Sequence, residues 1–68
     1  SIIPVMVEGY LSEDQVYVGR SYRDIPDVDG FTFFPCEKEL IGGTIVDVKI
    51  TGINGYDLKG DYLNESSK

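Results

Sequence analysis

Apolar and polar residues alternate along five short segments of the chain, and a period of two is typical of strands with one buried face. The clearest segment spans residues 44–51, where Val46, Val48 and Ile50 share one face. The other four segments cover residues 2–8, 15–21, 31–34 and 56–63. Closure of these strands would leave no exposed sheet edge. We therefore predict an all-β fold, a small five-stranded antiparallel barrel.

The alternation also predicts which side chains face the interior of this barrel. Tyr17 is expected to face outward, and Tyr56 and Tyr62 to face inward. A turn is expected at Asn54-Gly55, and one helical turn at residues 37–40. The predicted domain covers residues 1–63, followed by a frayed tail at 64–68. The predicted inward set is Val5, Val7, Val16, Val18, Phe33, Val46, Val48, Ile50 and Leu58.

The stretch from Gly19 to Gly30 separates the second strand segment from the third, and its composition rules out regular structure. Pro26 lacks a backbone donor and restricts the residue before it. Charged loops of this length more often serve recognition than packing. We expect the partner-binding residues here. They are Arg20, Tyr22, Arg23, Asp24, Asp27 and Asp29. The alternative is that the arginines pair internally with the aspartates.

The charge balance narrows the choice of partner. Twelve acidic residues oppose six basic ones, which gives a net charge of −6. Nucleic-acid binding depends on Lys and Arg neutralising phosphates, so this balance disfavours RNA or DNA. It favours a cationic protein surface, although surplus acid also serves simply to keep a small domain soluble.

Independent catalysis is not expected, and we predict no catalytic residue, no metal site and no cofactor in this chain. There is no histidine, and the single Cys36 has no imidazole to form a thiolate pair. The three loop aspartates lack the spacing of a calcium loop, because Pro26 interrupts it. No apolar run is long enough for a membrane span. We expect a cytoplasmic monomer.

Four motifs together resemble a TRAM domain, and the resemblance covers essentially the whole chain. They are Val5-Met6-Val7-Glu8-Gly9, Gly19-Arg20-Ser21, the alternating pattern from Gly43 to Thr51, and Asp57-Leu58-x-Gly60. The resemblance implies an OB-fold-like barrel attached to an RNA-modifying or related enzyme, and the family is usually credited with RNA binding.

The pattern of the central stretch, Arg-x-x-x-Asp-x-Pro-Asp-x-Asp-Gly, is similar to the RimO branch of the methylthiotransferases. Ile25 and Asp27 depart mildly from the commonest form. This likeness implies a radical-SAM parent enzyme with iron-sulfur clusters and S-adenosylmethionine, which modifies an aspartate of small-subunit ribosomal protein twelve. This chain would then recognise that substrate and contact its own catalytic domain.

Two alternatives to substrate recognition stay open. One is a generic RNA-binding module that uses Arg20, Arg23 and Lys49. The other is a structural cap that packs on the parent enzyme through outward apolar residues such as Ile45 and Leu63.

Overall fold

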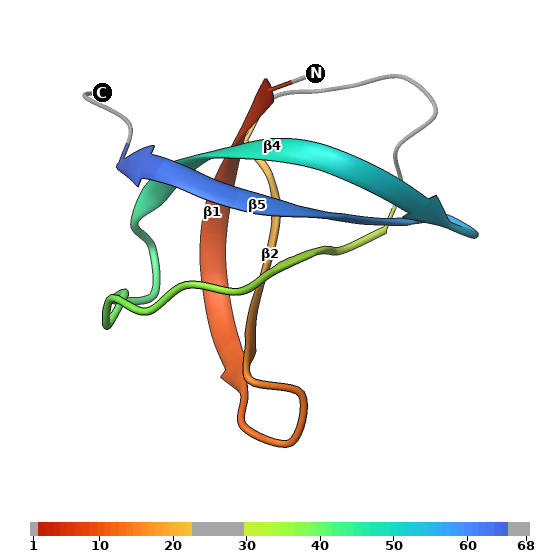
Figure 1. Cartoon of the computed structure of the whole chain (residues 1–68). Helices are drawn as coiled ribbons and strands as arrows, with labels where there is room; N and C mark the ends of the chain where they lie inside the picture. Colours follow the sequence, from red (N-terminus) through yellow and green to blue (C-terminus); the bar gives the residue numbers. More distant parts are fainter. Residues whose placement is uncertain (1, 23–29, 66–68) are drawn as a thin grey trace.

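Five strands make up the chain in the computed structural model, which describes residues 2–22 and 30–65 (Figure 1). No helix occurs within these two ranges. The turn predicted at Asn54-Gly55 joins the last two strands, and Gly55 adopts a positive φ of 68° there. The strands are β1 (Ile2–Leu11), β2 (Val16–Ser21), β3 (Thr32–Phe34), β4 (Ile45–Asn54) and β5 (Asp57–Glu65).

The strands close into a barrel in the order β1-β2-β3-β5-β4, with β4 returning to pair with β1. This confirms the predicted five-stranded all-β barrel, although one of its pairs is parallel and not antiparallel as predicted. Four of the neighbouring pairs are antiparallel, and β3–β5 is parallel, with Thr32 opposite Leu58 and Phe33 opposite Lys59. Strand directions cannot alternate all the way around a closed ring with an odd number of strands. One parallel pair is therefore a geometric requirement.

The barrel interior is filled by apolar side chains from all five strands and from the connector between β3 and β4. The predicted inward residues of β1, β4 and β5 are confirmed, and Ile50 is partly buried against the same cluster. Burial of such side chains is the main favourable term for folding. The buried cluster consists of Ile3, Val5, Val7, Tyr17, Phe34, Leu40, Val46, Val48 and Leu58.

The predicted facing of β2 was wrong. Tyr17 is buried, whereas Val16 and Val18 are only half-buried on the other face. The Tyr17 hydroxyl donates to the Lys38 carbonyl at 3.0 Å and accepts from the Leu40 N–H at 2.9 Å. A tyrosine can face the interior because both capacities of its hydroxyl are satisfied there.

The predicted facing of β3 was also wrong, because β3 pairs with β2 and its facing follows from that register. Tyr17 lies opposite Phe34 in the register, so Phe34 and Thr32 are fully buried and Phe33 faces partly outward. Gly19 lies opposite Thr32 on the inward face, where β1 approaches closely. A Cβ on Gly19 would collide with the Met6 carbonyl oxygen. Val16 and Val18 thus point outward, and Gly19 occupies the inward position where β1 leaves no room for a Cβ.

Three smaller expectations for the second half of the chain can also be compared. No helical turn forms at residues 37–40. Tyr56 lies in the turn between β4 and β5 and is exposed, so its predicted inward position was wrong. Tyr62 is partly buried against the core. β5 continues through Glu65, and residues 66–68 lie outside the described ranges. The domain boundary at residue 63 stays a prediction.

Candidate recognition surface

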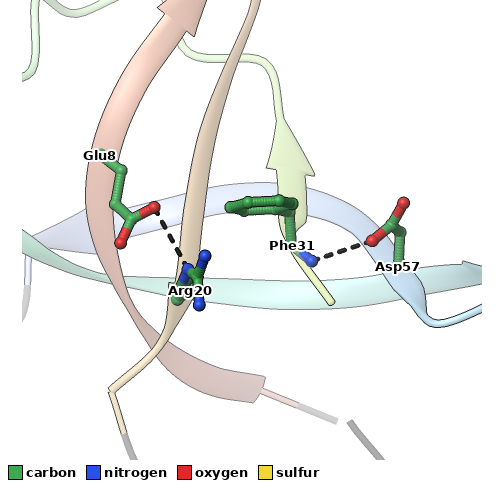
Figure 2. A network of polar contacts seen from close by, with 4 residues as sticks. All are labelled: Glu8, Arg20, Phe31 and Asp57. Carbon is green, nitrogen blue, oxygen red and sulfur yellow. Dashed lines mark hydrogen bonds and ion pairs between the residues drawn. The ribbon is translucent and has the colours of Figure 1, made fainter. Parts of the chain in front are cut away.

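Arg20, near the end of β2, is held by one residue from β1 and another next to β3 (Figure 2). Its Nε lies 3.4 Å from Oε1 of Glu8, and its Cζ lies 4.7 Å from the centroid of the Phe31 ring. Exposed ion pairs contribute about 0–1 kcal/mol, and a cation over an exposed ring contributes about 0.5–1 kcal/mol. The two contacts fix the direction of the guanidinium more than they stabilise the fold.

Phe31 is in turn attached to the first residue of β5. Its N–H donates to Oδ1 of Asp57 at 2.9 Å, and its carbonyl accepts from the Leu58 N–H at 2.9 Å. Gly30 packs so closely on Tyr56 and Asp57 that a Cβ would have no room. The chain that enters β3 is thereby pinned to the start of β5.

The first three residues of the stretch from Gly19 to Gly30 belong to β2, so the prediction that it has no regular structure was wrong there. The next residue is attached to β1, because the Tyr22 N–H donates to the Pro4 carbonyl at 2.9 Å. The Tyr22 side chain is exposed. Tyr22 and Gly30, the described residues on either side of residues 23–29, are therefore both placed by contacts with the barrel.

The sequence-predicted binding residues divide into two groups. Arg20 and Tyr22 are described and lie on the outside of the barrel. The other four, Arg23, Asp24, Asp27 and Asp29, lie outside the described residues. Among residues 2–22 and 30–65, the acid that pairs with Arg20 is Glu8 on β1, which was not among the predicted binding residues.

Asp57 and Phe31 were also missed as parts of this network. The sequence carries no local signal for their contact, because 26 positions separate them and the contact depends on the parallel β3–β5 pair. The contact of Glu8 with Arg20 follows from the β1–β2 pairing, in which Met6, two residues before Glu8, lies opposite Arg20.

Two of the three cations proposed for RNA binding, Arg20 and Lys49, are not brought together by the described strands, and the third, Arg23, lies outside the described residues. Arg20 lies opposite Met6 on one side of β1, and Lys49 lies opposite Ile2 on the other side. Four residues along β1 correspond to about 13 Å. The Lys59 side chain runs across Gly52 on β4. Arg20 and Lys49 therefore do not form one compact basic patch.

A groove lies beside β5, where the chain leaves β3. It has a volume of about 450 Å³ and is lined by Pro35, Cys36, Glu37, Lys38 and Tyr62. Cys36 is a free thiol and is partly buried against the core. Residues 2–22 and 30–65 contain no group of three or more side chains suited to a metal ion. Within the same ranges, no helix is long and apolar enough to cross a membrane.

Comparison with known proteins identifies the architecture. The TRAM domain family model matches residues 1–63. The chain belongs to the TRAM domain family. The five-stranded barrel is thus a TRAM domain.

Relatives of this TRAM domain include proteins named ribosomal protein uS12 methylthiotransferase RimO. The protein from Carboxydothermus hydrogenoformans is 43% identical over 63 residues, covering 93% of this chain and 14% of the relative. The one from Acetivibrio thermocellus is 40% identical over 67 residues, covering 98% and 15%. The one from Petrotoga mobilis is 51% identical over 53 residues, covering 75% and 12%. The chain spans about one seventh of the length of these relatives.

Proposed function

We propose that this TRAM domain is a non-catalytic recognition module of a RimO-type methylthiotransferase, and that it contacts the basic ribosomal protein substrate. The similarity to proteins named uS12 methylthiotransferase carries the proposal. The enzyme would act in the cytoplasm, where ribosomal proteins are made and assembled.

The charge of the domain supports a protein partner over a nucleic acid. A net charge of −6 attracts a cationic protein and repels a phosphate backbone. The acidic residues Asp24, Asp27 and Asp29 would steer the basic protein toward the barrel, and the exposed Tyr22 would supply contact area.

The chemistry of the parent enzyme would reside outside this chain. Iron-sulfur clusters are held mainly by several cysteine thiolates, and this chain has one cysteine and no histidine. The residues present therefore do not fit a cluster. Clusters and S-adenosylmethionine would be bound by the remainder of a RimO-type radical-SAM enzyme, which this domain would contact.

RNA binding is the second candidate function, favoured by one feature of the surface. Phe31 and Phe33 lie side by side with ring centroids 6.4 Å apart, and Arg20 covers Phe31. Aromatic rings next to a guanidinium can stack with bases. Glu8 already pairs with Arg20, however, which weakens the attraction of that guanidinium for phosphate.

A structural cap is supported less specifically. Of the two residues predicted to face outward, Leu63 is exposed and Ile45 is half-buried. Ile53 and Tyr56 are strongly exposed at the β4–β5 turn. These two apolar side chains would suit contact with a catalytic domain.

Titration of the isotope-labelled domain, once with purified bacterial uS12 and once with a short single-stranded RNA, separates these functions. We expect saturable shifts with uS12 that weaken as salt rises, because steering by exposed charge is screened over about 8 Å at physiological salt. Shifts with RNA alone would refute the proposal.

The double variant Asp24→Asn, Asp27→Asn tests the role of the acidic stretch. It should bind uS12 several-fold more weakly and keep the melting temperature, since exposed charges contribute about 0–1 kcal/mol to stability. If the aspartates instead lock the stretch internally, the melting temperature would fall and binding would decline only with unfolding.

A further inference from the structure

The parallel β3–β5 pair of the barrel is much shorter than the β4–β5 pair beside it. β3 pairs with β5 only at Leu58 and Lys59, whereas β5 pairs with β4 along its whole length. β3 ends at Phe34 because Pro35 has no N–H to continue the ladder. From Gly60 to Glu65, the only strand pairing of β5 in the described part of the chain is with β4.

The chain after β3 leaves β5 instead of following it. Figure 1 shows the green segment that follows β3 separating from the blue β5 as it runs toward the start of β4. Contacts with β2 and β1 draw it away: the Tyr17 hydroxyl bonds to Lys38 and Leu40, and the Gly43 N–H donates to the Val7 carbonyl at 2.8 Å. The groove lined by residues 35–38 and Tyr62 opens along this divergence.

Tyr62, which lines the groove, carries a hydroxyl that is buried and unpaired among the described residues. The Tyr62 ring is stacked at 6.5 Å from Phe34 in the core, and its hydroxyl is buried without a hydrogen-bond partner among residues 2–22 and 30–65. A buried hydroxyl normally finds a partner, and its absence costs stability. Because the hydroxyl is closed off from the solvent, a segment bound in the groove would contact the rest of the Tyr62 side chain.

The charges around the groove select the kind of occupant. Glu37 lines it, and Asp61 and Glu65 project from the strand whose edge is free; all three are exposed. Lys38 is the one cation in the lining. Since Lys49 on β4 lies opposite Asp61, the acidic surplus comes from Glu65 and from the net charge of −6 of the chain. This surplus suits a basic segment and disfavours a nucleic acid.

We propose that the free edge of β5 and the adjoining groove bind an extended, basic segment of the partner protein as an added strand. Unpaired strand edges are templates for such pairing, with backbone hydrogen bonds giving affinity and pockets selecting side chains. An edge of six residues offers about 20 Å of backbone, a common strand length. The inference rests on the proposed function, since the segment belongs to the basic ribosomal protein.

Two charge reversals at neighbouring positions test the site. Glu37 lines the groove, whereas Glu39, two residues on, does not, and both are exposed. Glu37→Lys should weaken binding of purified bacterial uS12 about tenfold, and Glu39→Lys less than about threefold, although the two variants have the same net charge. Amide exchange of the domain should slow at residues 60–65 when uS12 is bound, because strand addition protects backbone N–H groups.

The outcomes separate this inference from the proposed function. Equal loss of affinity in the two variants, or unchanged exchange along β5 with uS12 bound, would overturn the added strand and leave the recognition role in place. Failure of the unaltered domain to bind uS12 at all would overturn both. Circular dichroism spectra and melting temperatures of the two variants verify that they remain folded.

Discussion

Asp57 accepts a hydrogen bond from the backbone of Phe31 at 2.9 Å, and this contact joins the first residue of β5 to the chain entering β3. It stands at the start of the barrel's parallel pair, which has only two residue pairs in register. A second hydrogen bond, which the Leu58 N–H donates to the Phe31 carbonyl, joins the same two segments. The stability of this short parallel pair therefore depends more on each hydrogen bond than the stability of the long β4–β5 pair does.

Asp57→Ala should therefore lower the free energy of unfolding by about 1–2 kcal/mol, because the Phe31 N–H loses a charged acceptor. For a domain of this size, each kcal/mol corresponds to about 4–8 °C in melting temperature. Asp57→Asn keeps a side-chain oxygen acceptor and serves as the control, with a loss of less than about half as much. Equal losses in the two variants would show that the hydrogen bond is not the stabilising feature.

The contact between Arg20 and Phe31 can be measured in a double-mutant cycle. Arg20→Lys removes the planar group that lies over the ring, and Phe31→Leu removes the ring. We expect a coupling free energy of about 0.5–1 kcal/mol from urea unfolding. A parallel cycle for Arg20 and Glu8 should give less, and its value should shrink in high salt. A coupling of zero between Arg20 and Phe31 would contradict the geometry.

Two tyrosine-to-phenylalanine changes provide a matched pair, since each deletes one buried oxygen. Tyr17→Phe leaves the Leu40 N–H without its acceptor, so it should cost about 1–3 kcal/mol of unfolding free energy. Tyr62→Phe removes a hydroxyl that has no partner among the described residues and should be neutral or slightly stabilising. Thermal unfolding of the two variants decides the matter, and a larger loss in Tyr62→Phe would be the opposite of our expectation.

The interior assignment of β4 predicts a large loss of stability when its buried side chains are truncated. Val48 is fully buried, and Val48→Ala should lower the free energy of unfolding by about 1–3 kcal/mol through lost burial and an unfilled cavity. Ile53 lies on the same strand but is 73% exposed, so Ile53→Ala should change stability by less than about 0.5 kcal/mol. An unchanged melting temperature in Val48→Ala would show the register to be wrong.

The sequence by itself determined the class of fold, the number of strands and the inward faces of β1 and β4. In β4 the β-branched residues alternate with polar ones, and in β1 they share one face while the other face carries Pro4, Met6 and Glu8, so the β-branched face is the one to bury. It also indicated the turn at Asn54-Gly55, because that dipeptide tolerates the positive φ that the turn needs. The family followed from four motifs, which needed no three-dimensional information.

Only the tertiary structure decided the facing of β2 and β3. Both faces of these strands carry large apolar residues, so alternation alone could not choose between Val18 and Tyr17, or between Phe33 and Phe34. The choice came from partners distant in the chain: Lys38 and Leu40 for the Tyr17 hydroxyl, and the close approach of β1 at Gly19. The Phe31–Asp57 contact and the free edge of β5 likewise arise from the parallel closure, because that pairing joins segments more than 20 residues apart.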